Sequence, residues 1–321
     1  MDLYLNALSF TATLIILVSL TLYLRSKNIV STTDAPMIAR IVVGVVLPAL
    51  LFRQLAFIDL TSEILRLSLY FILAQFLVAS ISVFVGKRLL KLPDPSLGVF
   101  ILCSTFGSTA ILGSAFISAV FHGDHHAIGT GLLVSQLAVG IPANIFCPIV
   151  VMVCGEAREN KLTTKNIIRT ILLAPSTIAI ALGLIWSVGS LPTEGLAITP
   201  IFKACEYVSG SLVFMVALLN GLSLQAISIK RDFITVISCC FLILVAEPTI
   251  LYWINSLMQI TTLDQQISFM LAAMPSSNSI IAFAIRYKAD SKLAATLVTT
   301  TVALSALSVP LIMPFFRIFS M

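Results

Sequence analysis

Ten apolar segments, each of roughly 20 residues, follow one another along this chain, and a segment of that length can cross a bilayer as a helix. Of the 321 residues, 59% are hydrophobic and only 10% are charged, whereas a soluble domain carries about 25% charged residues. We therefore expect an all-α polytopic membrane protein with ten transmembrane helices. The expected spans are residues 3–24, 37–58, 65–86, 97–120, 127–153, 168–190, 198–221, 233–255, 266–286 and 293–316.

The basic residues favour one side of the predicted membrane. If ten spans alternate in direction, fourteen Lys and Arg residues fall on one face and two, Arg66 and Arg317, on the other. Cytoplasmic loops carry the excess of Lys and Arg. Both termini are therefore predicted to be extracytoplasmic, in a cell membrane such as a bacterial inner membrane. The fourteen residues are Arg25, Lys27, Lys87, Arg88, Lys91, Arg158, Lys161, Lys165, Arg169, Lys230, Arg231, Arg286, Lys288 and Lys292.

No group of residues has the spacing of a cofactor or metal site. The six cysteines lie in or at the ends of apolar spans without a CxxC pair, so we expect them to pack as small apolar residues. The patch His122–His126 contains residue types that commonly bind metal ions, but the sequence offers no second set of ligands for it. We expect no cofactor and no metal. The net charge of +5 is explained by topology, so we expect no nucleic-acid partner.

The two halves of the chain present their segments in a similar order. A shift of 169 residues lays each of the first five spans on one of the last five, and it lays "STAILGS" (108–114) on "SNSIIAF" (277–283). A repeat of five spans must enter the membrane upside down in its second copy, which is common in secondary transporters. We predict a first repeat over residues 1–154, a cytoplasmic linker over 155–169 and an inverted second repeat over 170–321.

Spans four and nine contain residues that interrupt a helix at matching depths. Pro275 lacks an N–H group and clashes with the carbonyl four residues earlier, and Gly107 stands among hydroxyl residues. Free backbone at membrane depth is tolerated where it lines a cavity or is buried in protein, and half-helix N-termini favour an anionic group. We predict two broken crossover helices that bind a substrate, with close helix packing as the alternative. Spans five and ten also contain Gly, Ser, Thr, Asn or Pro, and we expect interruptions there.

The candidate substrate-binding residues follow from these two breaks. The weaker candidates, Asn144 in span five and Thr299 in span ten, approach the same depth. The candidates at the breaks are Ser108, Thr109, Pro275, Ser277, Asn278 and Ser279.

Glu247 is the most deeply placed carboxyl, about two-thirds of the way through span eight and directly before Pro248. A carboxylate there costs about 2.5–3.5 kcal/mol on insertion scales, and an apolar setting disfavours its charged form. Glu247 is therefore a candidate carrier of a coupling proton, and a structural carboxyl is the alternative. Two further expectations concern span seven and span two. Glu206 pairs with Lys203 at i, i+3 spacing. Arg53 extends toward the outer interface, and attraction of an anion is the alternative.

Three stretches resemble the auxin efflux carrier family: "VVLPALLF" (45–52), "LLAPSTIAIALGLIW" (172–186) and "AAMPSSNSIIAFAIRYKADSKLAA" (272–295). The resemblance covers nearly the whole chain. It implies a ten-helix fold like that of bile acid sodium symporters, in which spans four and nine cross and a crossing domain moves against spans one, two, six and seven. Many relatives have Asn where Ser108 stands. The resemblance implies transport of small organic anions such as dicarboxylates or auxin-like carboxylates.

The function that these features predict is secondary active transport of a small organic anion by alternating access, coupled to protons. No nucleotide-binding motif of the form GxxxxGK[ST] is present, so the energy is expected to come from a membrane gradient. A sodium-coupled symporter of the bile-acid type is the alternative, and a non-transporting membrane sensor is a weaker one. An enzyme is not expected, because the spans carry no reactive constellation. A homodimer in the lipid bilayer is compatible with this interpretation.

Overall fold

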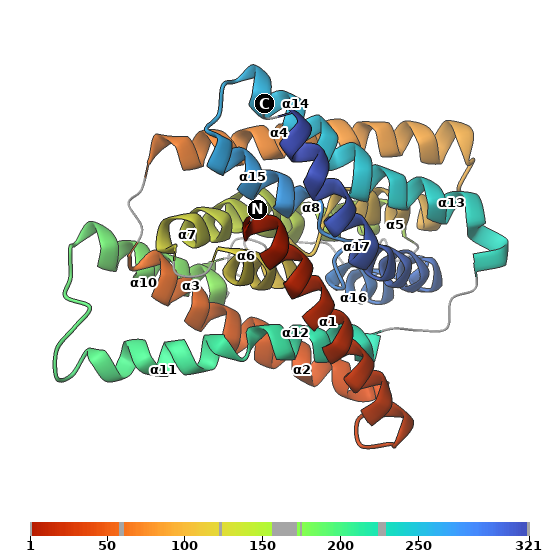
Figure 1. Cartoon of the computed structure of the whole chain (residues 1–321). Helices are drawn as coiled ribbons and strands as arrows, with labels where there is room; N and C mark the ends of the chain where they lie inside the picture. The colour runs from red at the N-terminus through yellow and green to blue at the C-terminus, as the bar shows by residue number, and fades with distance from the viewer. Residues whose placement is uncertain are drawn as a thin grey trace. The chain divides into compact units, whose positions relative to one another are not determined.

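The computed structural model describes residues 2–57, 61–121, 124–155, 172–173, 175–223 and 229–319, and every regular element within these ranges is a helix (Figure 1). The predicted linker at 155–169 lies outside these ranges except for Gly155. The all-helical class expected from the sequence is therefore confirmed for the described residues. In these ranges the one pairing of extended backbone is an isolated bridge, which belongs to the candidate site.

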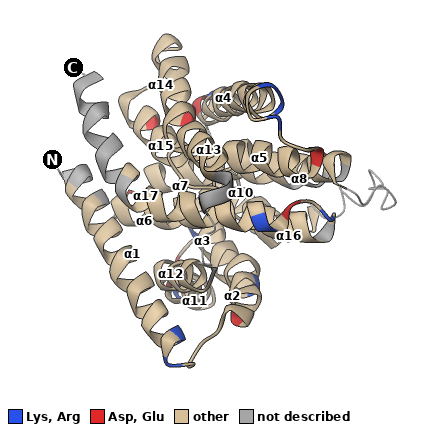
Figure 2. Ribbon diagram, turned by 90° about the vertical axis from the view of Figure 1, so that its right-hand side faces the viewer, with Lys and Arg blue, Asp and Glu red and all other residues tan. Residues whose placement is uncertain are grey.

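Among the residues that the structure describes, six helical stretches are long and apolar enough to cross a membrane. Large apolar side chains on them are widely exposed, such as Ile16 and Phe76, each more than two-thirds exposed. Most of the ribbon carries neither Lys, Arg, Asp nor Glu (Figure 2). Exposed apolar surface of this extent is suited to lipid rather than water. The six stretches are Leu8–Ser26, Thr32–Leu55, Ser62–Leu89, His125–Val151, Thr199–Leu222 and Phe233–Leu257.

The other four predicted spans have different forms. The segments at 97–120 and 266–286 are each divided into shorter helices. The segment at 168–190 begins outside the described residues and contains the apolar helix Pro175–Val188. The segment at 293–316 lies in one continuous helix, Ser291–Phe319, so the interruption expected in span ten is wrong. The intrahelical hydrogen bonds of Thr296 and Thr300 to carbonyls four residues earlier show how this helix accommodates its hydroxyl residues.

The chain divides into two compact units, and each unit draws on both halves of the sequence. Unit 1 comprises residues 1–64, 114–133 and 168–224, and unit 2 comprises residues 65–113, 134–167 and 225–321. The described helices of unit 1 are α1 (Asp2–Ser26), η1 (Thr32–Asp34), α2 (Ala35–Ile41), η2 (Val42–Val46), α3 (Leu47–Leu55), α6 (Ser114–Val120), α7 (His125–Val134), α10 (Pro175–Val188), α11 (Thr199–Gly210) and α12 (Leu212–Ser223).

Small residues allow the helices of unit 1 to pack closely. A Cβ atom added to Gly221 of α12 would lie 2.7 Å from Thr21 of α1, and one added to Gly183 of α10 would lie 3.0 Å from the carbonyl oxygen of Phe52. Small residues at such crossings let helix backbones approach each other within a membrane.

An ion pair and a group of aromatic rings join α3 to its neighbours in unit 1. Arg53 Nη2 lies 3.3 Å from Glu206 Oε1 on α11, so the expected pairing of Glu206 with Lys203 is wrong. The Phe52 ring packs against Trp186 and Phe202. Because α11 packs on α3 through these rings, Glu206 meets a cation from another helix in place of the one on its own helix.

Unit 2 contains the divided span at 266–286 and most of the one at 97–120, whose last helix, α6, belongs to unit 1. Its described helices are α4 (Ser62–Phe84, which begins in unit 1), η3 (Val85–Leu89), α5 (Asp94–Thr105), η4 (Thr109–Gly113), η5 (Ser135–Gly140), α8 (Ile141–Cys154), α13 (Ile229–Phe241), η6 (Leu242–Ala246), α14 (Glu247–Leu257), α15 (Thr262–Ala272), α16 (Ser279–Arg286) and α17 (Ser291–Phe319).

Three prolines within spans are each preceded by one turn of π-helix, so the chain crosses the membrane without a full break. Pro48, Pro142 and Pro248 each stand second in an α-helix that follows a π turn. Proline removes an N–H donor and crowds the preceding turn, and a wider π turn relieves the crowding with i→i−5 bonds. These bonds run from Leu47 N to Val42 O, from Ile141 N to Gln136 O and from Glu247 N to Leu242 O.

Candidate functional site

Both predicted helix breaks are present in unit 2. Helix α5 ends at Thr105, and the π turn η4 begins at Thr109. Helix α15 ends at Ala272, and α16 begins at Ser279. The residues between them, 106–108 and 273–278, are not helical. We call these two interruptions together the crossover.

The two interruptions pair with each other through their backbones. Gly107 and Ser276 form an antiparallel bridge. Ser108 N donates to Pro275 O at 2.6 Å, and Ser277 N donates to Phe106 O at 3.0 Å. Backbone groups that leave a helix at membrane depth must find other partners. Each break therefore supplies the partner that the other lacks.

The close approach at the bridge depends on Gly107. A Cβ atom at this position would lie 3.0 Å from the carbonyl oxygen of Met274. That distance is shorter than an ordinary van der Waals contact, so a larger residue would push the two breaks apart. Gly107, which was expected only to loosen the helix, also allows the second break to come close.

Ser276 fixes the crossover to two neighbouring helices. Its Oγ donates to the carbonyl of Cys103 at 2.6 Å, and its backbone N–H donates to Thr301 Oγ1 of α17 at 3.3 Å. Thr301 in turn donates to Val298 O. Ser276 has no exposed surface. It therefore holds the geometry of the crossover, and it does so without facing an open space.

Ser276 and Thr301 are absent from the residues proposed from the sequence. The signal for Ser276 was present, because the shift of 169 residues lays Gly107 on it. The signal for Thr301 was ambiguous, because Thr299, Thr300 and Thr301 follow one another and the sequence does not show which of them faces the break. In the structure it is Thr301, while the predicted Thr299 is buried elsewhere on α17.

The predicted residues at the crossover differ in exposure. Ser108, Thr109 and Pro275 are buried, whereas Ser277 and Asn278 are partly exposed. The hydroxyls of Ser277 and Ser279 lie 2.9 Å apart, on the exposed side of the break. The structure thus brings Ser108, Pro275 and Ser277 together at the bridge. It presents the polar side chains of 277–279 at the start of α16.

The crossover also collects four helix ends. Helices α5 and α15 end at it, and the helical stretch Thr109–Val120 and α16 begin at it. The N-terminus of a helix carries partial positive charge and the C-terminus partial negative charge. Groups of both signs can therefore be bound within a few residues of the bridge.

Two predicted site residues lie away from the bridge. Asn144 belongs to α8, and its side chain is outside the described part of the structure. Glu247 begins α14 directly after the π turn η6, and its side chain is only 2% exposed. The carboxyl of Glu247 interacts with the Gln75 side chain of α4. Within the described residues, neither Glu247 Oε2 nor Gln75 Nε2 has a partner that satisfies the distance and angle of a hydrogen bond.

A comparison with known families and proteins relates this chain to membrane transporters. A family described as membrane transport protein matches residues 8–313. Over an alignment of 312 residues the chain is 23% identical to an uncharacterized transporter of Methanocaldococcus jannaschii. The alignment covers 92% of this chain and 94% of the relative. The matched family consists of transporters and not of enzymes.

The family match spans almost the whole chain, and it agrees with the sequence motifs that resemble auxin efflux carriers. The helices are those of a multi-pass membrane protein. The chain belongs to the membrane transport protein family, which is the auxin efflux carrier family.

Proposed function

We propose that this chain is a secondary active transporter that moves a small organic anion by alternating access, with the crossover as its substrate site. The observation that carries the proposal is the pair of backbone hydrogen bonds at the bridge. Ser108 donates to Pro275 and Ser277 donates to Phe106. Each break donates one of these bonds to the other, so the ends of the four surrounding helices lie close to the bridge. A charged ligand can bind to such helix ends without a charged side chain.

The same bonds support a 5+5 inverted repeat with ten spans. Gly107 and Ser276 differ in number by 169, which is the shift that aligns the two halves of the sequence. The bond partners 106 and 275 and the donors 108 and 277 are related by the same shift. An exchange of this kind is expected when two copies of one unit meet around a twofold axis in the membrane plane.

The composition of the two units is also consistent with paired repeats. Most of spans one and two group with spans six and seven in unit 1, and most of spans three, four, five, eight, nine and ten group in unit 2. Residues 114–133 depart from this pattern, because they group with unit 1. We propose that unit 2, which holds the whole bridge, changes the side to which the site is open.

Substrate recognition is assigned to the residues around the bridge. Ser277, Asn278 and Ser279 present hydroxyl and amide groups at the start of α16, where the helix terminus favours an anion. Ser108 and Thr109 stand at the corresponding start of the other half-helix. Asn144 and Thr299 remain weaker candidates. A small carboxylate or dicarboxylate has the charge and the acceptor oxygens that such a site would bind.

Glu247 is proposed to carry the coupling proton. It is buried beside Gln75, and no cation is paired with it in the described residues. An unpaired carboxylate is costly at membrane depth, whereas a protonated carboxyl is neutral. A protonated Glu247 would release its proton and become charged only when the site is hydrated or a ligand arrives. Proton release would then depend on the state of the substrate site, which is what coupling of protons to transport requires.

The test is uptake into proteoliposomes that contain the purified chain. Radiolabelled malate and malonate are offered with an imposed pH gradient, with an imposed sodium gradient, or with neither. Accumulation against the anion gradient is expected with the pH gradient alone. Accumulation that requires sodium would establish the alternative, a sodium-coupled symporter. No entry of a panel of organic anions under any gradient would contradict transport of this substrate class.

A further inference from the structure

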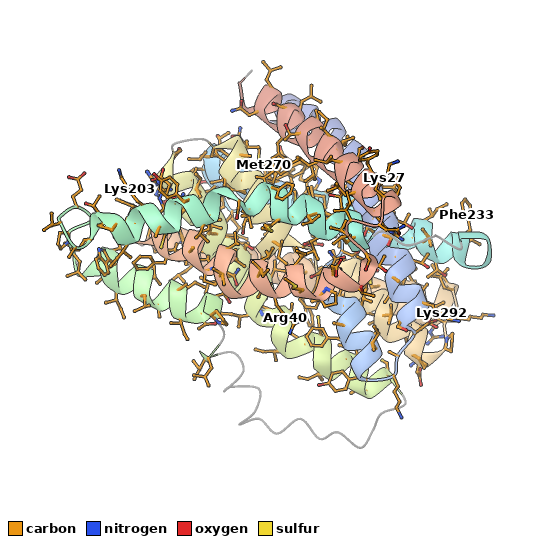
Figure 3. The ribbon with its side chains drawn as sticks, turned by 90° about the horizontal axis from the view of Figure 1, so that it is seen from below. Lys27, Arg40, Lys203, Phe233, Met270 and Lys292 are labelled. Carbon is orange, nitrogen blue, oxygen red and sulfur yellow. The ribbon has the colours of Figure 1, made fainter. Side chains whose placement is uncertain are left out.

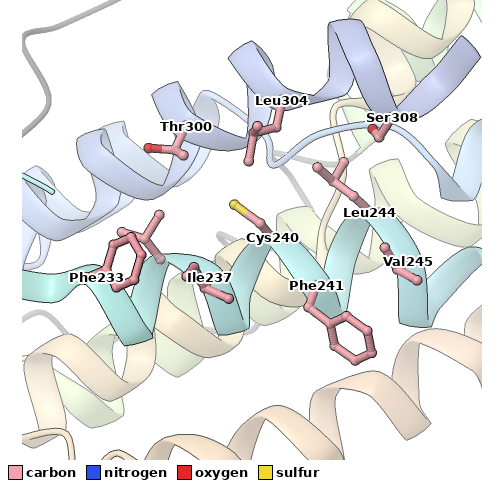
Figure 4. A pocket seen from close by; sticks show the side chains of 10 residues that line it. Phe233, Ile237, Cys240, Phe241, Leu244, Val245, Thr300, Leu304 and Ser308 are labelled. Atoms are coloured by element: carbon pink, nitrogen blue, oxygen red, sulfur yellow. The ribbon is translucent and has the colours of Figure 1, made fainter. Parts of the chain in front are cut away.

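A groove runs between α13 and α17 in unit 2. Its volume is about 540 Å³, and it continues along the π turn η6. Phe233, Ile237 and Phe241 line it from α13, and Leu304 lines it from α17 (Figure 4). These four side chains are 41% to 58% exposed. The groove is thus an apolar groove that is open at the protein surface, and it is not part of the closed core.

The position of the groove identifies the medium around it. Its long wall belongs to Phe233–Leu257, which is long and apolar enough to cross a membrane. The lining residues of that wall extend from Phe233 to Val245, a rise of about 18 Å along a helix. One leaflet contributes about 15 Å of hydrocarbon. The groove is therefore as long as one leaflet is deep.

The volume of the groove distinguishes between two apolar occupants. A helix of the same length and about 10 Å in diameter occupies roughly 1,400 Å³, which is well above the 540 Å³ available. A helix of a second copy could only pack on the mouth of the groove without filling it, whereas an extended acyl chain is narrow enough to lie along its length. The size therefore favours a lipid chain.

One end of the groove is basic. Phe233 and Thr300 lie at the same end (Figure 4), and Lys292 precedes Thr300 on α17 by about 12 Å of helix. Lys230 and Arg231 stand just before Phe233 in the sequence of α13, with Asp232 between them and Phe233, so the three basic residues leave this end with a net positive charge. Phe233 and Lys292 lie on the same side of the molecule in the view of Figure 3. The bias of Lys and Arg predicts that this end is cytoplasmic, and basic residues there attract anionic headgroups.

We propose that this groove binds one acyl chain of an anionic phospholipid from the cytoplasmic leaflet, with the lipid phosphate near Lys292. The site adjoins the crossover through a single turn of α17. Thr300 lines the groove, and the next residue, Thr301, accepts the backbone hydrogen bond of Ser276. The occupant of the groove thus contacts the helix turn that supports the break.

Native mass spectrometry of the purified chain tests the proposal. The chain is equilibrated with equal amounts of phosphatidylglycerol and phosphatidylcholine, and the wild type is expected to retain one phosphatidylglycerol. Leu304→Trp fills the groove and is expected to lose that lipid. Leu77→Trp is the matched control, because Leu77 on α4 is exposed to a similar extent but lies outside the groove, and it should retain the lipid. Ile237→Trp fills the groove from the opposite wall and replaces Leu304→Trp if that variant fails to fold.

The headgroup is tested by Lys292→Gln, which is expected to lower the preference for phosphatidylglycerol over phosphatidylcholine about fivefold. Retention of phosphatidylglycerol by both groove-filling variants would overturn the site. An unchanged preference in Lys292→Gln would overturn the headgroup assignment. A dimer that Leu304→Trp converts to a monomer would show an interface between copies and so also overturn the proposal. Lipid retention is measured without transport, so it is independent of the proposed function.

Discussion

At the scale of single residues, Gly107 is the glycine of the crossover, and an added side chain would be crowded against the backbone of the second break. We predict that Gly107→Val destabilises the protein by about 1–3 kcal/mol, because extra methyl groups at a tight contact force the backbone to shift. The contact is 3.0 Å from an added Cβ to Met274 O. Thermal unfolding in detergent measures the effect. Gly44→Val is the control, because nothing lies within 4 Å of a Cβ added at Gly44. Equal unfolding midpoints for the two variants would contradict the prediction.

The polar side chains at the start of α16 are predicted to act on the substrate and not on the fold. Asn278→Ala and Ser277→Ala should weaken substrate binding by up to about a hundredfold, because losing one hydrogen-bond partner once the bound substrate has displaced water costs roughly 1–3 kcal/mol. Equilibrium binding of a transported anion to purified variants provides the measurement. Ser80→Ala serves as control, since the Ser80 hydroxyl is exposed and bonds only to its own helix. Wild-type affinity in both variants would mean that these residues pack helices.

Glu247 is predicted to determine coupling rather than binding. Glu247→Gln keeps the shape of the side chain and mimics its protonated form. It should leave exchange of substrate across the membrane largely intact and abolish uphill accumulation driven by a pH gradient. Both quantities are measured in the same proteoliposomes. A variant that still concentrates substrate under an imposed pH gradient would assign Glu247 and its neighbour Gln75 a structural role.

At the scale of helices, the crossover depends on α17 through one hydroxyl. We predict that Thr301→Val lowers the unfolding midpoint, because it leaves the buried N–H of Ser276 without its acceptor at a cost of roughly 1–3 kcal/mol. Thr296→Val is the control: Thr296 bonds only to its own helix, at Lys292 O. If both variants unfold at the same temperature, the bond between α17 and the crossover contributes nothing measurable.

The helices and their breaks were largely predictable from the sequence, whereas their partners were not. Apolar length locates the spans, and Pro275 marks the second break because proline cannot continue a helix. The bond from Ser276 to Thr301 joins positions 25 residues apart, and local patterns carry no information on which hydroxyl faces which break. The pairing of Glu206 with Arg53 was missed for the same reason. Helical spacing favoured Lys203, but helix packing brought a cation from another helix.

At the scale of the whole molecule, the direction of the chain across the membrane is the main prediction. Both termini should be extracytoplasmic, because fourteen basic residues fall in loops of one face and two on the other. Fusions of alkaline phosphatase and of a fluorescent protein to the C-terminus report its side. Phosphatase activity without fluorescence is expected. Fluorescence without phosphatase activity would contradict the orientation and the count of ten spans.

The bridge between Gly107 and Ser276 also sets an order of events during synthesis. The break at 106–108 enters the membrane about 170 residues before its partner has been made, and unpaired backbone in lipid costs several kcal/mol. Because its hydrogen-bond partners are in the second half, the first half cannot reach its final form alone. The length of the connecting chain is a small obstacle by comparison, since each doubling of loop length adds only about 0.6 kcal/mol to the free energy of closure. A chain that stops before residue 275 leaves the N–H of Ser108 and the carbonyl of Phe106 without the partners that they have in the complete protein.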